Sequence, residues 1–387
     1  MSRLPRDLLL LSLPTLLAVA LLEILLRTVV VASTPPRGYF EAGNAIYRFD
    51  PELPTGVFTR GPLARDPVTW EVNAQGWLST VDYTTARERD RARIAVIGDS
   101  YVEALEVGTA HAFPTLLGEL LEGAPEVYAF GTSGAPLSQY LHLARHVARR
   151  YDPDLLVISV VHNDFAESLA AVNPGEVQFM RLAPDGNGGF REEAPTANAA
   201  FLQFHRLKRF ARRSALVRYL YLNCHIKETV QGLRYLLRHN EHAAYSENVD
   251  VTVLRDARSE IVAAIDYVVA ALANENRERR VLIMMDGRRQ QIYAKAADSP
   301  TAFLHDELRA ATERHGVGFL DLHPLMAAAY AVDERPFNPT DDGHWNRYGH
   351  AFVARALAAH LRAGGRTSRL AQGDGAGGEP QALRPAD

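Results

Sequence analysis

Five short apolar runs alternate with amphipathic stretches along the middle of this 387-residue chain, and this alternation restricts the possible folds most strongly. Apolar runs of this length are typical of strands buried on both faces. The runs are Arg93–Ile97, Val127–Phe130, Leu155–Val161, Val281–Met285 and Phe319–Leu322. The stretches with helical spacing are Leu116–Leu121, Tyr140–Arg150, Ser259–Asn274, Thr301–His315 and Ala351–Leu361. Together they predict an α/β fold, in which a parallel sheet has helices on both faces and carries its active site at the carboxyl ends of the strands.

Composition excludes several classes of protein. The chain has 42 Lys+Arg, 46 Asp+Glu and 47% hydrophobic residues, so it is neither disordered nor strongly basic, and we expect no nucleic-acid partner. Its single cysteine, Cys224, excludes an internal disulfide framework and a thiolate zinc cluster. Gly186–Gly189 lacks the strand, helix and lysine of a phosphate-binding loop. We therefore expect no cofactor and no metal.

The amino terminus carries a long apolar run. Leu8–Leu26 is nineteen residues with eleven leucines, enough to span a bilayer core of about 30 Å. Its one acid, Glu23, can pair with Arg27 one helical turn later. Two arginines precede the run, which favours a cytoplasmic amino terminus. We expect residues 1–33 to form a single-pass anchor in the inner (cytoplasmic) membrane, with the catalytic domain on the periplasmic or extracytoplasmic side.

Two alternatives remain open for this run. It is also compatible with a signal peptide cleaved near Ala32, or with a buried core helix.

The rest of the chain divides into three parts. Residues 34–90 are rich in proline and aromatic residues and predict an irregular extension packed on the domain. Residues 91–363 are predicted to form the domain itself, and residues 364–387 are predicted to be a disordered tail.

An insertion of about residues 165–250 interrupts the domain. Within it, residues 205–239 carry nine Lys+Arg and one acid, a local balance of +8, with aromatic residues at helical spacing. These features predict amphipathic helices. Their function is open between a lid, a surface for anionic lipid headgroups and a groove for an acidic polysaccharide. The alternative is a helical hairpin packed on the sheet with a solvated basic face.

The first apolar run leads into Gly98-Asp99-Ser100. A serine that follows a buried strand and enters a helix presents its hydroxyl beside backbone N–H groups that can stabilise an anion. A serine helix cap gives the same pattern, so the tripeptide alone does not decide between them.

Three further blocks follow at comparable places. Thr132-Ser133-Gly134 and His162-Asn163-Asp164 come after the second and third runs, and Asp341-Asp342-Gly343-His344 precedes the last helix. In this order the blocks resemble the SGNH (GDSL-like) hydrolase superfamily over about residues 93–362. The amino-terminal run and the blocks Gly98–Ala104 and Gly343–His350 are similar to its bacterial single-span envelope members, including relatives that acetylate exopolysaccharides. The resemblance implies a three-layer α/β/α flavodoxin-like fold.

The resemblance also implies roles for individual residues. Ser100 corresponds to the nucleophile, and His344 and Asp341 to the other two members of a catalytic triad. Ser100, Gly134 and Asn163 correspond to the donors of an oxyanion hole. The chain departs from the family pattern at Tyr101, where leucine is usual, and at Ala129-Phe130, which replaces an asparagine.

The same chemistry follows from the residue types. A serine hydroxyl needs an adjacent base at pH 7, which His344 can provide, and a carboxylate on the second ring nitrogen would orient that base. Asp341 fits the family spacing better, but Asp342 remains an alternative. Asp99 and Asp164 are expected to support the loops that hold their neighbours.

One further pair of residues follows the fourth run. Arg288 and Arg289 are compatible with an anionic substrate or, more simply, with solvated surface.

We therefore expect a membrane-anchored serine esterase or acyl hydrolase that forms an acyl-enzyme on Ser100 with a small-molecule or glycan ester. One alternative is an O-acyltransferase, such as an acetyltransferase, that modifies an envelope or extracellular polysaccharide with acyl groups from a membrane partner. The second alternative is a catalytically dead glycan-binding scaffold. The complete set of site residues argues against the scaffold.

Overall fold

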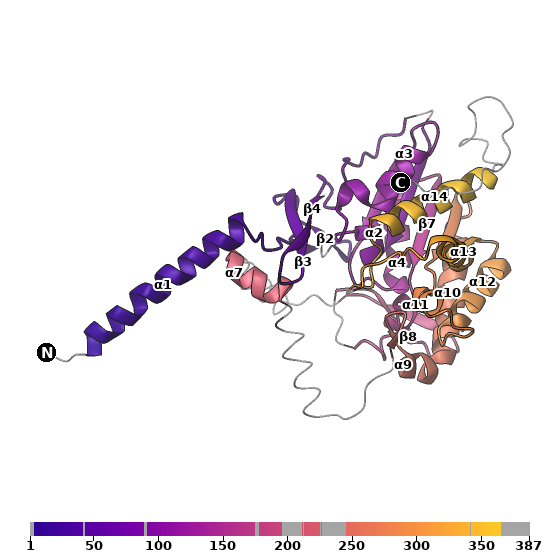
Figure 1. The fold of residues 1–387 in the computed structure, drawn as a ribbon. Coiled ribbons are helices and arrows are strands. Elements are labelled where there is room, and N and C mark those ends of the chain that lie inside the picture. Colours follow the sequence, from indigo (N-terminus) through magenta and orange to yellow (C-terminus); the bar gives the residue numbers. More distant parts are fainter. Residues whose placement is uncertain are drawn as a thin grey trace.

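The computed structural model describes residues 4–41, 43–88, 91–174, 178–195, 211, 213–224, 226, 245–340 and 342–364 (Figure 1). Side chains of residues 4–11 and 245 are outside this description. Nearly all of the predicted tail, and residues 205–210 and 227–239 of the predicted basic segment, lie outside the described residues.

A five-stranded parallel sheet forms the centre of the domain, in the order β13-β12-β7-β5-β6. Its strands are β5 (Arg93–Gly98), β6 (Glu126–Gly131), β7 (Leu155–Val160), β12 (Arg280–Met285) and β13 (Gly318–Asp321). Each of the five predicted apolar runs supplies one strand, so the predicted α/β fold with a parallel sheet is confirmed. The first strand in sequence lies between the second and third, which is the order of flavodoxin-like sheets.

Helices cover both faces of this sheet (Figure 1). One face packs on α4 (Leu137–Tyr151), α10 (Arg258–Glu275) and α12 (Ala302–His315). The other packs on α3 (Phe113–Leu120), α11 (Arg289–Ala294), α13 (Leu322–Asp333) and α14 (Arg347–Ala363). Strand β5 serves both cores, because Ala95 and Ile97 point to the first and Ile94 and Val96 to the second.

Short elements complete the domain. They are α2 (Ser100–Glu103), a 3-10 helix (Thr109–His111), α5 (Asn163–Glu167), β10 (Tyr245–Ser246), β11 (Val249–Asp250) and α9 (Val251–Asp256). Of these, α2 and α5 directly follow β5 and β7, so they begin at the carboxyl edge of the sheet.

The segment before the domain forms two antiparallel hairpins. They are β1 (Gly38–Glu41) with β2 (Ile46–Phe49), and β3 (Thr55–Arg60) with β4 (Arg65–Glu71). Its aromatic residues attach it to the edge strand β6. Trp77 packs edge-on against Phe130, and Tyr83 Oη donates to Ala129 O at 2.8 Å and accepts from Ala129 N at 2.9 Å. These bonds satisfy backbone groups that an edge strand would otherwise expose.

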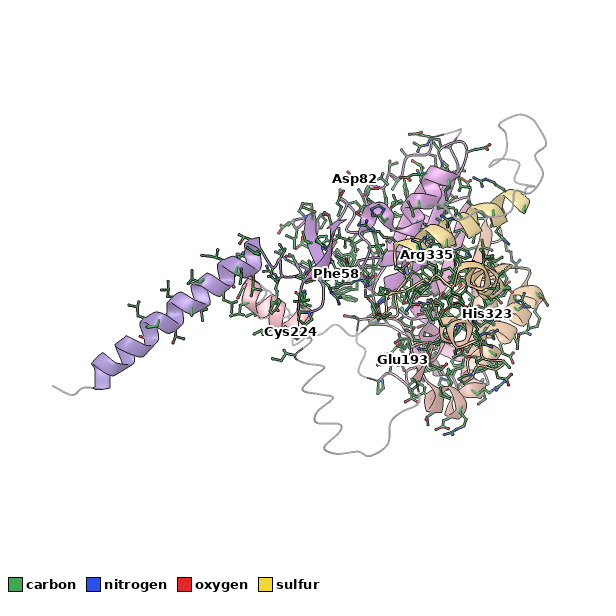
Figure 2. All side chains as sticks on the ribbon, in the orientation of Figure 1. Phe58, Asp82, Glu193, Cys224, His323 and Arg335 are labelled. Atoms are coloured by element: carbon green, nitrogen blue, oxygen red, sulfur yellow. The ribbon has the colours of Figure 1, made fainter. Side chains whose placement is uncertain are left out.

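The amino-terminal run forms helix α1 (Leu4–Thr28), which includes Pro14 and projects from the rest of the molecule (Figure 1). Its described side chains stand out around the helix, with Leu13, Leu16 and Leu17 at least 60% exposed (Figure 2). In the part of the chain that the structure describes, no helix combines the length and the apolar character needed to cross a membrane. The first four residues of the predicted span have no described side chains.

The described part of the insertion includes helices within residues 205–239, as predicted, but they do not pack on the sheet as the hairpin alternative requires. It contains an antiparallel β-hairpin, β8 (Arg181–Pro184) with β9 (Phe190–Glu193), whose turn is closed by the Asp185 carboxylate. It also contains α7 (Ala215–Arg218) and a π-helix (Tyr219–Asn223). This second part packs against α1 and the β3–β4 hairpin, away from the sheet (Figure 1).

Candidate active site

Three neighbouring strands bring the first three sequence blocks to one edge of the sheet. Ser100 follows β5, Gly134 follows β6 and Asn163 follows β7. Because β5 lies between the other two strands, these residues end at the same carboxyl edge. Gly98 permits the tight exit from β5, since a Cβ there would lie 2.5 Å from Val102 Cγ2.

Ser100 and His344 are in direct contact. The loop between α13 and α14 holds His344 so that its Nε2 lies 2.8 Å from Ser100 Oγ. When the ring carries its proton on Nδ1, Nε2 accepts the serine proton, as a general base must. The structure therefore brings together the predicted nucleophile and the predicted base, which are 244 residues apart in sequence.

The carboxylate on the far side of the imidazole belongs to Asp342. Its Oδ1 lies 2.6 Å from His344 Nδ1 and also accepts from the backbone N of His344 at 2.9 Å. Asp341, to which we assigned this role from the family spacing, lies outside the described residues. A carboxylate two residues before an amide readily closes an Asx-type turn, and here the same oxygen also reaches the ring. The structure thus gives to Asp342 the contact predicted for Asp341.

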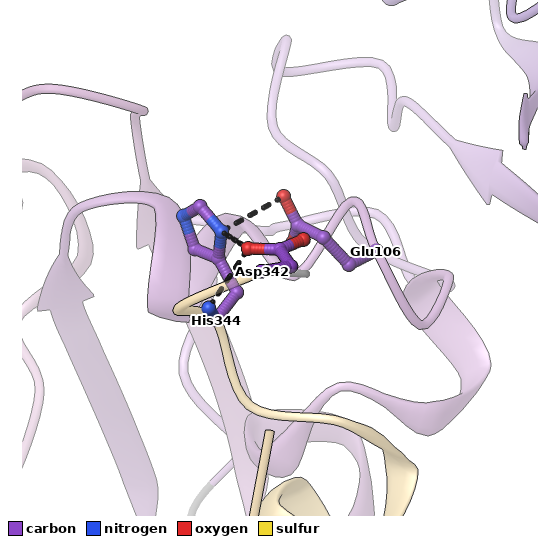
Figure 3. A group of neighbouring side chains, drawn as sticks. All are labelled: Glu106, Asp342 and His344. Atoms are coloured by element: carbon purple, nitrogen blue, oxygen red, sulfur yellow. Dashed lines mark hydrogen bonds and ion pairs between the residues drawn. The ribbon is translucent and has the colours of Figure 1, made fainter. Parts of the chain in front are cut away.

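A second carboxylate lies beside this pair (Figure 3), and one arginine is close to Asp342. Glu106 Oε1 is 3.6 Å from His344 Nδ1, and Arg60 Nη2 is 4.0 Å from Asp342 Oδ2. Sequence reasoning missed both residues. Glu106 lies in a turn after α2 and Arg60 at the end of β3, and neither belongs to a recognisable motif.

These charges shift the ionisation of the base. Burial alone would lower the pKa of His344, but Glu106, Asp342 and Asp99 raise it to about 9. Burial also raises the pKa of Glu106, while the nearby His344 counteracts this. For Asp342, burial favours a higher pKa, but the hydrogen bond and charge of His344 leave the pKa lowered. The resting site therefore favours a protonated imidazole between carboxylates.

Glu106, Asp342 and His344 also place possible metal-ligand atoms within 4.8 Å of one another. Two ligands of one tetrahedral zinc ion, each about 2.0–2.2 Å from the metal, lie roughly 3.3 Å apart. Asp342 Oδ1 and His344 Nδ1 are closer than this, at hydrogen-bonding distance. We therefore assign the three side chains to acid–base chemistry.

Gly134 and Asn163 lie at the same edge of the sheet as Ser100, and their role as oxyanion donors stays a prediction. Gly134 has a φ of 76° and has open space on the side where a Cβ would be, apart from Phe179 at 3.8 Å. Asn163 Nδ2 donates to Glu167 Oε2 at 3.1 Å, one turn along α5. An amide nitrogen carries two hydrogens, so this bond orients Asn163 and leaves one hydrogen for a substrate oxygen.

The two aspartates expected to support the loops are both buried. Asp99 Oδ1 accepts from Tyr101 N at 3.0 Å and so caps α2, while its Oδ2 lies 3.2 Å from Ser100 Oγ. Burial raises the pKa of Asp99 to about 6. Asp164 Oδ2 accepts from Val161 N at 2.8 Å, which closes the turn before Asn163.

A buried network fixes the loop that carries His344. Tyr101 Oη donates to Gly343 O at 2.7 Å, and Arg289 Nη1 donates to the same oxygen at 2.6 Å. Arg289 also pairs with Asp286 at 3.0 Å, and Asp286 accepts from Trp345 Nε1 at 3.0 Å. Arg289 is only 6% exposed, so the interpretation of this residue as solvated surface is wrong, and its guanidinium is held by groups of the protein itself.

The sequence profile of the GDSL-like lipase/acylhydrolase family matches residues 96–352, about two thirds of the chain. The chain belongs to this family. It is accordingly a hydrolase that acts on ester bonds, and the predicted family and enzyme class are confirmed. A search of curated proteins gives no match.

Solved structures similar to this chain include other members of the family. A lipolytic G-D-S-L protein from Veillonella parvula is 12% identical, with 70% of this chain and 98% of that chain covered and a TM-score of 0.36. A lipase/acylhydrolase from Enterococcus faecalis is 12% identical, with 70% and 96% covered and a TM-score of 0.36. A carbohydrate acetylesterase family member from Sinorhizobium meliloti is 13% identical, with 70% and 98% covered and a TM-score of 0.32.

Proposed function

We propose that this hydrolase is a serine esterase that forms an acyl-enzyme on Ser100 and acts on small-molecule or glycan esters. The observation that carries the proposal is the continuous contact from Ser100 Oγ through both ring nitrogens of His344 to Asp342 Oδ1. This is the arrangement of nucleophile, base and orienting carboxylate that acyl transfer requires.

In this mechanism Ser100 Oγ attacks the ester carbonyl carbon and its proton passes to His344 Nε2. The carbonyl oxygen becomes an oxyanion that accepts from Ser100 N, Gly134 N and Asn163 Nδ2. The intermediate then collapses, the bond to the alcohol breaks, and His344 returns the proton to the leaving oxygen. Water repeats these steps on the acyl-enzyme and releases the carboxylic acid. Each oxyanion donor is worth about 2.7–4 kcal/mol of barrier.

The exposure of the site favours water as the acceptor. Ser100 and Asp342 are both partly exposed, and the side chain of His344 is 31% exposed. Water can therefore reach an acyl group on Ser100. Transfer to a polysaccharide hydroxyl, with a membrane partner as acyl donor, remains the alternative. Incubation with an acetyl ester and candidate glycans, followed by measurement of free acetate and acetylated sugar, separates the two outcomes.

A fluorophosphonate probe tests the nucleophile directly. We expect the full chain in detergent to be labelled, S100A to lose all labelling, and S259A, which removes an exposed serine on α10, to keep it. Equal labelling of S100A would refute the assignment. A folded chain without labelling or esterase activity would support the dead glycan-binding scaffold instead.

We further propose that α1 attaches the chain to the cytoplasmic membrane and that the hydrolase domain lies on the periplasmic side. Support comes from the leucine-rich sequence of this helix and from its exposed apolar side chains. The test is fractionation of cells that express the full chain, followed by protease treatment of spheroplasts. Recovery in the soluble fraction, or protection of the hydrolase domain from external protease, would contradict the proposal.

A further inference from the structure

We propose that Glu106 is a second carboxylate partner of the catalytic base, sharing the Nδ1 edge of His344 with Asp342 and setting the pH range in which this base works. The inference rests on the proposed function, because it requires His344 to take the proton of Ser100. Glu106 would act through His344 and is therefore a positioning residue.

The chain directs Glu106 to this place through two tight turns. Helix α2 ends at Glu103, and Ala104 caps it with a φ of 55°, which turns the chain back, and with an N–H that donates to Ser100 O at 2.8 Å. Gly108 follows with a φ of 78°, and a Cβ there would lie 2.4 Å from Thr69 O. Glu106 is therefore held between the helix that carries the nucleophile and strand β4 of the extension.

The side chain of Glu106 has few other interactions to explain its burial. It is 11% exposed, and its Oε1 lies 3.6 Å from His344 Nδ1. Its Oε2 is buried without a hydrogen-bond partner among the described residues. A buried carboxylate is costly unless an opposite charge stabilises it, and His344 is the nearest group that can carry one.

The surrounding charges define the expected direction of its effect. The charged groups that interact with Glu106 are His344 and Asp342 from the loop before α14, Arg60 from β3, and Glu103 from α2, while Asp99 acts on His344. Carboxylates outnumber cations in this set. An imidazolium is stabilised by the carboxylates and destabilised by Arg60, and burial strengthens both effects.

This arrangement has two consequences for the reaction. In the free enzyme, the second carboxylate keeps the proton on His344 to higher pH, so less of the base is available near neutrality. In the transition state, His344 has just accepted the proton of Ser100, and the same carboxylate stabilises the new cation. Glu106 thus makes His344 a stronger base and shifts the pH range in which the enzyme works to more alkaline values.

The pH profile of kcat/KM of the full chain tests this role. We expect E106Q to shift the acidic limb to lower pH by about one unit. At a given pH on that limb, kcat/KM of E106Q, expressed as a fraction of its own plateau, should then be roughly tenfold higher than in the wild type. We expect R60Q to shift the limb in the opposite direction and E106D to stay close to the wild type. E52Q, an exposed change in the extension, is the matched control.

A second measurement does not depend on turnover. The Cε1–H signal of His344 can be followed by NMR in the S100A variant and assigned by its loss in H344Q. In the double variant S100A/E106Q this signal should titrate at lower pH than in S100A. Unchanged titration in folded E106Q would refute the inference even if the enzyme is an active esterase. So would equal losses of kcat in E106Q and E106D without a shift of the acidic limb. Retained activity in S100A would instead refute the proposed function.

Discussion

At the scale of single residues, sequence reasoning found the chemistry but not the full charge environment. Ser100 and His344 could be predicted because each stands in a short block with a characteristic place at a strand or helix end. The family spacing favoured Asp341 as the acid, whereas the structure places Asp342 against His344, since spacing does not show which side chain the loop turns toward the ring. Glu106 could not be found at all, because its role depends on the tertiary approach of two loops.

The choice of acid is testable by two neighbouring substitutions. D342N removes the charge beside Nδ1 and should lower kcat by on the order of 10²-fold or more, since the ring loses its orienting carboxylate. D341N should stay near the wild-type rate. The measurement is kcat for a chromogenic acetyl ester at the pH plateau. A large loss in D341N with little in D342N would restore the assignment made from the family spacing.

The raised pKa of His344 makes a separate prediction about pH. Only the neutral ring can accept the serine proton, and the carboxylates around it raise its pKa to about 9. Activity on a neutral ester should therefore increase as pH increases through 7 and 8, and should reach about half of its maximum near pH 9. The check is kcat/KM between pH 5 and 10 at constant ionic strength. A plateau already reached at pH 6 would show that the imidazolium is not stabilised in the working enzyme.

At the scale of elements, periodicity predicted all five central strands and their parallel arrangement. Helices α11 and α13 were not predicted, although α11 carries Arg289 and α13 leads into the loop of His344. Helix α13 begins at Leu322, directly where β13 ends, and the predicted strand Phe319–Leu322 extends into it by one residue. Arg289 lies in the first turn of α11, and its part in the buried support for the His344 loop could not be predicted because that support depends on tertiary contacts.

That buried support predicts a coupled loss of stability and activity. R289M removes the partner of Asp286 and one donor to Gly343 O, which leaves a buried carboxylate without its cation. Breaking such a pair costs about 3–5 kcal/mol of unfolding free energy. The unfolding free energy, measured by urea denaturation, and kcat should both decrease in R289M. The double variant D286N/R289M should recover part of the lost unfolding free energy. R279M, which removes a more exposed pair with Asp152, is the control. Equal stability losses in R289M and R279M would count against the network.

At the scale of the whole molecule, three segments far apart in sequence meet at the end of α1. The β3–β4 hairpin and residues 213–224 both pack there, and Asn223 Nδ2 donates to Thr59 Oγ1 at 3.0 Å. Neither contact could be predicted from the sequence. Composition marked residues 205–239 as basic, but it carries no information about a partner nearly 200 residues away. The same hairpin supplies Arg60 to the active site, so the extension joins the helix to the hydrolase.

Glu23 connects α1 to this assembly and allows it to be tested. Its carboxylate accepts from Ala215 N at 2.7 Å, Leu216 N at 3.0 Å and Ser214 Oγ at 2.8 Å, so it caps the start of α7. Because E23A leaves these donors without an acceptor, residues 213–224 should detach more often. Trypsin should then cleave after Arg213 several-fold faster, as measured by mass spectrometry of the full chain in detergent.

Hydrolysis of a soluble ester should be unchanged in E23A, since the segment packs away from Ser100 and His344. The matched control is E52A, which removes an exposed acid of the extension and should leave the cleavage rate at its wild-type value. If E23A were cleaved no faster than E52A, the cap would not hold the segment in place. If E23A lost esterase activity while remaining folded, the contact at α1 would be coupled to the active site through the extension, and the separation argued from the fold would be wrong.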